Sequence, residues 1–145
     1  MELWFDLDGT LADTLRNEKP WYEISDEEWV EIVKSAKGMV NLSALARLLH
    51  RAQKNGHTIG VVSWLPKTRT KEAETIEAKR EWLAKRLPSV KWDAIDIVPN
   101  GTAKWDGRNG FLFDDNKKNR REWDKHNGNG TAFNYTEILV ILKEL

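Results

Sequence analysis

The sequence contains no cysteine, and this absence excludes several kinds of site at once. Without thiols the chain cannot build a disulfide framework or a zinc site made of thiolates, and it has no cysteine nucleophile. Phosphatases that attack their substrate with a cysteine are therefore excluded as models for its chemistry.

An excess of charge of either sign is also missing. Lysine plus arginine and aspartate plus glutamate both number 23, so the formal net charge is zero. A neutral chain has no overall field that would attract DNA, RNA or an anionic membrane surface. Local charges must then hold any anionic ligand.

Long hydrophobic runs are absent as well. The N-terminal run Leu3-Trp4-Phe5 is interrupted by Asp6, so it is too short for a signal peptide or a membrane span. We therefore expect a cytoplasmic protein without membrane contact, either a monomer or a weak dimer. Its 145 residues suffice for one compact core and not for two, which predicts a single domain over 1–145.

Strand-like and helix-like segments alternate along the whole chain. The β-rich or buried segments are 3–7, 58–63, 94–98, 111–113 and 131–133, and the segments with helical periodicity and caps are 25–37, 43–54, 70–87, 116–126 and 134–145. This alternation predicts an α/β fold, a three-layer Rossmann-like domain with a parallel five-stranded sheet. In such a sheet, ligands bind beyond the carboxyl ends of the strands.

Polar residues follow the predicted strands at those ends. Asp6 and Asp8 follow the first strand, Ser63 ends the second, and Asp114 and Asp115 follow the fourth. Four carboxylates that meet at one point repel one another unless a cation lies among them. Because all the candidate ligands are oxygens, the expected cofactor is Mg²⁺.

These residues also form a set of family motifs. The stretch Phe5-Asp6-Leu7-Asp8-Gly9-Thr10 resembles the first motif of phosphatases of the haloacid dehalogenase (HAD) superfamily. Ser63 resembles the second motif, Lys104 the third, and the pair Asp114-Asp115 the fourth, in the family's order. Because each element closes a predicted strand, the joint match is far more specific than any one motif. The resemblance implies a HAD-like fold and a phosphatase that cleaves phosphate monoesters through an aspartyl-phosphate intermediate.

The family pattern assigns Asp6 as the nucleophile. An aspartate with the ordinary pKa near 4 is ionised at neutral pH and needs no activating base. The side chains of Asp6 and Asp114 and the backbone carbonyl of Asp8 would hold Mg²⁺. Asp115 would bind the metal through water or orient Lys104.

The remaining groups would stabilise charge and move protons. Lys104, the Ser63 hydroxyl and the Trp64 backbone N–H would contact the phosphoryl oxygens. Asp8 would protonate the leaving alcohol and later deprotonate the attacking water, which requires its side chain to stay off the metal. Gly9 and Thr10 belong to the same substrate-binding loop, where Thr10 would brace the backbone.

Two readings of another functional class compete with the phosphatase. A phospho-accepting signalling receiver uses similar groups, but it places the acidic pair on the first strand and the accepting aspartate later in the chain. A catalytically silent relative that binds phosphorylated ligands is the other. Phosphate release from an aryl phosphate with Mg²⁺ separates both from an enzyme.

The segment at about 12–41 has room for only a minimal helical cap inserted between the first two motifs. Such a cover leaves a site open, which the family associates with larger substrates. Trp21 and Tyr22 lie in it and offer rings to a nucleobase, and the chain is similar to small nucleotidases of bacteria and their phages. We therefore expect a small phosphorylated substrate, with nucleotides favoured and a polynucleotide end-phosphatase as the alternative. The basic residues within 116–126 are the candidate nucleic-acid contact, although acidic residues are interleaved with them.

Overall fold

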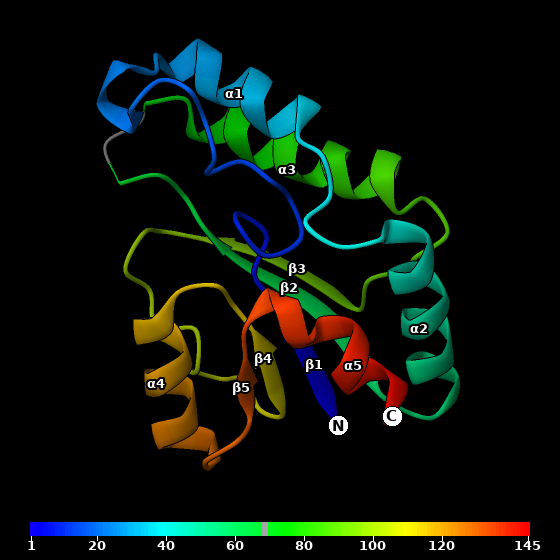
Figure 1. Ribbon diagram of the computed structural model, residues 1–145. Helices are drawn as coiled ribbons and strands as arrows, with labels where there is room; N and C mark the ends of the chain where they lie inside the picture. Colours follow the sequence, from blue (N-terminus) through cyan, green and yellow to red (C-terminus); the bar gives the residue numbers. More distant parts are fainter. Residues whose placement is uncertain (68–69) are drawn as a thin grey trace.

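A computed structural model describes residues 1–67 and 70–145, and it contains one parallel sheet with five strands. The strands are β1 (Glu2–Phe5), β2 (Thr58–Trp64), β3 (Ala94–Val98), β4 (Phe111–Phe113) and β5 (Ala132–Phe133). Their order across the sheet is β3-β2-β1-β4-β5, which puts β1 in the centre (Figure 1). The predicted α/β fold with a parallel five-stranded sheet is confirmed.

Helices cover both faces of the sheet and make the three layers (Figure 1). One core cluster joins Leu3 and Phe5 to residues of α2 (Leu42–Lys54), α3 (Glu72–Arg86) and α5 (Ile138–Lys143). On the other face Trp4 packs with Trp123 of α4 (Lys117–Asn127). Successive residues of β1 thus serve opposite faces, as the two-residue period of a strand requires.

The last helix begins with a short 3-10 turn, η2 (Tyr135–Glu137), where Asn134 and Glu137 form a capping box. None of the helices in 1–67 or 70–145 combines the length and the apolar character needed to cross a bilayer.

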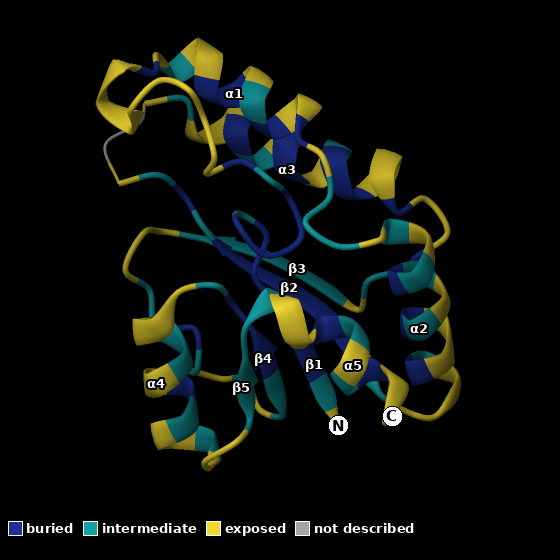
Figure 2. Ribbon diagram, in the orientation of Figure 1, coloured by how far each residue is buried: buried dark blue, intermediate teal, exposed yellow. Residues whose placement is uncertain are grey.

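The segment 12–41 forms one more turn and one more helix above this core. It contains η1 (Trp21–Glu23) and α1 (Asp26–Ser35), which begins at the predicted capping box of Ser25 and Glu28. Helix α1 lies along α3 and buries Trp29, Val30 and Val33 against it (Figure 2). The ends of the segment are pinned together, because the Asp13 N–H donates to the Lys37 carbonyl at 2.8 Å and the Met39 N–H donates to the Leu11 carbonyl at 2.8 Å.

The buried face of α3 differs from the predicted one. Ala73, Ile76, Leu83 and Leu87 recur at helical spacing in the sequence. Leu83 and Leu87 are buried, but Ala73 is exposed and Ile76 only half buried. The buried residues of the helix are Thr75, Ala78, Lys79, Trp82 and Leu83. Helix α3 packs against α1 as well as against the core. Lys79 points inward because it bonds to residues of the candidate site described below.

Candidate active site

The central strands bring the polar residues of the site to one edge of the sheet. Asp6 follows β1 and Asp114 follows β4, and these two strands pair in parallel. The Asp6 N–H donates to the Phe113 carbonyl at 2.8 Å, so the ladder continues to the first residue of the site. Ser63 lies near the end of β2, on the other side of β1.

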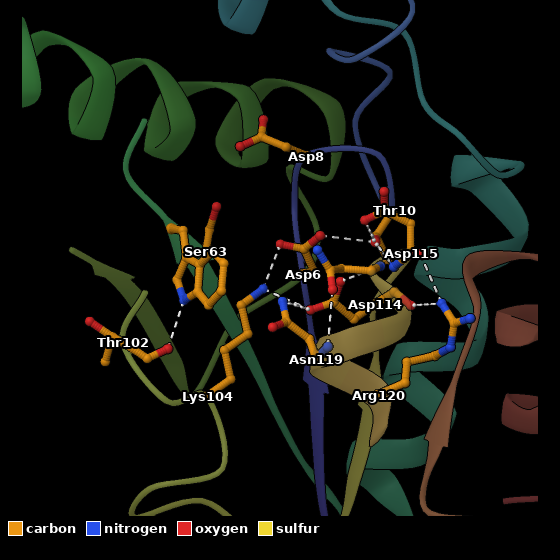
Figure 3. A network of polar contacts seen from close by, with 12 residues as sticks. Asp6, Asp8, Thr10, Ser63, Thr102, Lys104, Asp114, Asp115, Asn119 and Arg120 are labelled. Carbon is orange, nitrogen blue, oxygen red and sulfur yellow. Dashed lines mark hydrogen bonds and ion pairs between the residues drawn. The ribbon is translucent and has the colours of Figure 1, made fainter. Parts of the chain in front are cut away.

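Lys104 connects the two central carboxylates. Its Nζ donates to Asp6 Oδ1 at 2.9 Å and to Asp114 Oδ2 at 2.8 Å, and all three side chains are buried (Figure 3). Asp114 is held further by the Asn116 N–H and by Asn119 Nδ2, at 2.9 and 3.1 Å. The predicted convergence of Asp6, Lys104 and Asp114 is therefore present in the structure.

Three carboxylates lie close enough together at this edge of the sheet to bind one metal ion. Asp6, Asp114 and Asp115 each offer an oxygen, and these oxygens lie within 4.8 Å of one another. Carboxylate oxygens without any sulfur or imidazole donor are the ligand set of Mg²⁺ or another hard cation. The donor set therefore fits the predicted Mg²⁺.

Burial changes the ionisation of the cluster. It raises the pKa of Asp6 well above its usual value, with Lys104 opposing this and the carboxylates of Asp114 and Asp8 adding to it. Burial and the neighbouring carboxylates thus move the pKa of Asp6 upward from the ordinary value near 4 that its residue type suggests. For Lys104, burial works to lower the pKa, but Asp6 and Asp114 outweigh it and leave the pKa raised.

The loop after β1 is tied to the loop after β4. The Thr10 hydroxyl lies 3.1 Å from Asp6 Oδ2 and 3.2 Å from Asp115 Oδ1, and it accepts the Asp115 N–H at 3.0 Å. Gly9 has a φ of 76°, and a Cβ there would lie 2.6 Å from Asp115 Oδ2. Glycine is needed at this position both for the positive φ and for the close approach.

The acceptors of Lys104 are Asp6 and Asp114. The alternative in which Asp115 orients Lys104 is therefore not observed among the described contacts.

Asp8 lies apart from the three clustered carboxylates, on the side of α3 (Figure 3). Its Oδ1 accepts from the Thr14 hydroxyl at 2.8 Å, and its Oδ2 accepts from Lys79 Nζ at 2.8 Å. Among the described residues, the carboxylate cluster that could hold a metal ion does not include Asp8. Lys79 is a residue of the site that sequence reasoning missed.

A pocket of about 450 Å³ opens onto the acidic cluster. Charged residues of the site line it, and most of the lining surface is apolar. The charged residues are Asp6, Asp8, Lys104, Asp114 and Asp115, and the apolar side chains are those of Leu15, Trp21, Trp29, Trp64, Leu65 and Pro66. Lys104 also lies over the Trp64 ring, 5.4 Å from its centroid.

Not every predicted substrate contact reaches this pocket. Trp21 lines it, whereas Tyr22 and Ser63 are not among its lining residues in the described part of the chain. Tyr22 is 71% exposed and meets the Trp21 ring edge-on, with 5.9 Å between the ring centroids. A contact between Tyr22 and a substrate stays a prediction.

No protein-family model and no curated protein matches the chain in sequence. Solved structures match its fold. D,D-heptose 1,7-bisphosphate phosphatase from Burkholderia thailandensis superposes with a TM-score of 0.62 over 99% of this chain and 96% of that chain, at 9% identity. The D,D-heptose 1,7-bisphosphate phosphatase from B. bronchiseptica, complexed with magnesium and phosphate, gives 0.60 over 99% and 97% at 12% identity.

A chain of the Pnkp1/Rnl/Hen1 complex also matches, with a TM-score of 0.53 and 18% identity. The match covers 92% of the present chain and 44% of that chain. At these identities the likeness establishes the fold, which is HAD-like.

Proposed function

We propose that the chain is a Mg²⁺-dependent phosphatase that hydrolyses phosphate monoesters through an aspartyl-phosphate on Asp6. One observation carries the proposal: Asp6, Lys104 and Asp114 meet at the carboxyl edge of the sheet, on the floor of a pocket large enough for a small ligand. The motif order of the sequence and the HAD-like fold support it independently.

The side chains of Asp6 and Asp114 would hold the metal, together with Asp115 and the backbone carbonyl of Asp8. Bound Mg²⁺ supplies positive charge that offsets the repulsion between a carboxylate and a phosphate dianion. Lys104 supplies more of that charge, since its ammonium already lies between the Asp6 and Asp114 carboxylates.

The covalent steps need two carboxylates in different roles. In the first step an Asp6 oxygen bonds to phosphorus as the bond to the alcohol oxygen breaks. Asp8, in its protonated form, gives its proton to the alcohol oxygen and becomes the carboxylate that pairs with Lys79. In the second step Asp8 takes a proton from a water that attacks the phosphorus, and the bond to Asp6 breaks. The separation of Asp8 from the acidic cluster supports this division of roles.

The segment 12–41 is proposed to act as a minimal cap. It brings Leu15, Trp21 and Trp29 to the wall of the pocket. Aromatic walls beside a phosphate-binding floor favour a substrate with a flat or apolar leaving group, and a nucleotide is the substrate we expect.

Helix α4 favours a second candidate, a polynucleotide with a terminal phosphate. Lys117, Arg121 and Lys125 are exposed and follow one another at four-residue spacing, which places them on one face of the helix. The helix begins beside the pocket, where Asn116 and Asn119 form part of the lining. A strand laid along this basic face would present its end to Asp6.

A screen for phosphate release with Mg²⁺ tests the function and separates the candidates. The panel contains nucleoside monophosphates, sugar phosphates and oligonucleotides with phosphorylated ends. Asp6→Asn is the control for contaminating phosphatases and is expected to keep its fold and lose turnover, since the amide cannot form the intermediate.

Each outcome of the screen has a separate meaning. Turnover retained by Asp6→Asn would overturn the nucleophile. Binding of phosphorylated ligands without turnover by the unmodified chain would point to a silent binder or a phospho-accepting module. Equal or better turnover of sugar phosphates than of nucleoside monophosphates would remove the nucleotide preference.

A further inference from the structure

Lys79 is a lysine with no exposed surface, located in the middle of α3. Its Nζ donates to Asp8 Oδ2, to Ser63 Oγ and to the Trp64 carbonyl oxygen, each at 2.8 Å. An ammonium group has three hydrogens and no acceptor, so these contacts satisfy it completely. A buried charge is tolerated only when it is paired and hydrogen-bonded in this way.

The contacts fix Asp8 as firmly as they fix Lys79. Lys79 holds Asp8 Oδ2 and Thr14 holds Asp8 Oδ1, so both oxygens of the carboxyl group are engaged. The Asp8 side chain is 16% exposed, so one edge still reaches the pocket that it lines. Lys79 and Thr14 therefore fix the orientation of the Asp8 carboxyl group, and its exposed part faces the pocket.

The two buried lysines serve different carboxylates. Lys104 bonds to Asp6 and Asp114, in the group that could hold a metal, and Lys79 bonds to Asp8 outside that group. Without Lys79, Thr14 would be the one side chain in 1–67 and 70–145 that still bonds to the Asp8 carboxylate and holds it away from a cation at the acidic cluster.

We propose that Lys79 is a positioning residue that holds the Asp8 carboxyl group toward the leaving-group oxygen and away from the metal ligands. This proposal rests on the proposed phosphatase function, in which Asp8 gives a proton to the leaving-group oxygen. Lys79 also contacts Ser63 and the Trp64 carbonyl, which anchor its ammonium, and in this proposal it acts on the reaction through Asp8.

Leaving groups of different acidity give the sharpest test. A phosphate ester of an acidic phenol, p-nitrophenyl phosphate, departs with little help from a proton, whereas an alkyl phosphate depends on the proton from Asp8. Lys79→Met keeps the volume of the side chain and removes the contacts to Asp8. We expect kcat for the alkyl phosphate to fall at least tenfold more than kcat for p-nitrophenyl phosphate, with KM changed less than threefold.

A double-variant cycle separates positioning from a structural role. Asp8→Asn alone is expected to cost about a hundredfold in kcat for the alkyl phosphate. When Asp8 is already disabled, adding Lys79→Met should cost less than about threefold more, because residues that act as a unit are not additive. Equal losses on both substrates, or full additivity with Asp8→Asn, would overturn the proposal.

Lys85→Met is the matched control on the same helix. Its ammonium is exposed and paired with Glu81, one turn away. This variant should leave both kcat values unchanged. If Lys79→Met does not fold, Lys79→Gln takes its place in the cycle, because it shortens the side chain and still removes the charge.

Crystal structures of the unmodified chain and of Lys79→Met give a readout that needs no turnover. With Mg²⁺ present in both crystals, we expect the Asp8 carboxylate to leave its present position in the variant and to turn toward the cation at Asp6 and Asp114. An Asp8 side chain that stays in place would overturn the positioning role even if the chain is an active phosphatase. Absence of all turnover would contradict the proposed function while leaving this structural outcome readable.

Discussion

At the scale of single residues, the site gathers more carboxylates than the two buried lysines can neutralise. Lys79 and Lys104 are both buried, and each bonds directly to carboxylates. If all groups were ionised, their two positive charges would face four negative ones, those of Asp6, Asp8, Asp114 and Asp115. The excess of two negative charges equals the charge of one divalent cation. Burial is the main cause of the raised pKa of Asp6, and the neighbouring carboxylates of Asp114 and Asp8 add to it.

Replacing Asp8 is therefore predicted to destabilise the fold as well as the reaction. Asp8→Asn leaves the ammonium of Lys79 buried without a counter-charge, which is expected to lower the free energy of unfolding by roughly 3 kcal/mol. The double variant Asp8→Asn with Lys79→Met should recover most of this loss, since it buries no charge at all. Urea denaturation of the three proteins measures the difference.

The carboxylate of Asp13 provides the control for this cycle. Asp13 pairs with Arg16 at the surface, where that arginine side chain is 69% exposed. Asp13→Asn should change the free energy of unfolding by less than about 1 kcal/mol, because surface ion pairs contribute little. If Asp8→Asn lowers the free energy of unfolding no more than this control does, the contact between Lys79 and Asp8 does not stabilise the fold.

At the scale of elements, α1 and α3 form a two-helix unit that shapes the pocket wall. Val33 of α1 is fully buried in the cluster that also contains Trp29 and Ala78. Trp29 lines the pocket from the same helix, and Trp21 lines it from the turn before the helix. The packing of α1 on α3 therefore links the stability of segment 12–41 to the shape of the pocket.

Loosening this contact should affect substrate binding more than chemistry. Val33→Ala leaves a small cavity and is expected to lower the free energy of unfolding by about 2 kcal/mol. We expect KM for an aromatic substrate to rise several-fold while kcat stays within twofold, as measured by steady-state kinetics. Val140→Ala, at a side chain 61% exposed on α5, is the control with the same chemical change. Similar KM and kcat values for the two variants would mean that the packing of α1 on α3 does not determine how the pocket binds substrate.

The elements with strong local signals were predictable from sequence, and the inward face of α3 was not. Ser25 with Glu28 and Asn134 with Glu137 mark helix starts by capping boxes, because a cap needs only residues a few positions apart. Lys79 takes its partners from 8, 63 and 64, which no local pattern connects. The available signal was its four-residue spacing from Thr75 and its place one turn before Trp82 and Leu83, which puts a lysine on a buried face.

At the scale of the whole molecule, topology joins the motifs. The central strand β1 pairs with β2 on one side and with β4 on the other, so the residues after these strands become neighbours although they are about fifty residues apart or more in sequence. The sequence order of the motifs predicted that meeting because a parallel sheet has one carboxyl edge. The strand order itself, and the separation of Asp8 from the other three carboxylates, depend on packing and could not be derived from periodicity.

A cation that binds this assembled edge should stabilise the whole fold, since the candidate ligands follow β1 and β4, which are far apart in sequence, and do not meet in the unfolded chain. At a Mg²⁺ concentration about ten times the dissociation constant, the gain is roughly 1.4 kcal/mol, and for a domain of this size the melting temperature should rise by about 3–6 °C. Differential scanning fluorimetry with and without Mg²⁺ measures this. Asp114→Asn should abolish the rise, because it removes a fully buried ligand, whereas Asp106→Asn at an exposed position should retain it. An equal rise in Asp114→Asn and the unmodified chain would place the bound cation elsewhere on the molecule.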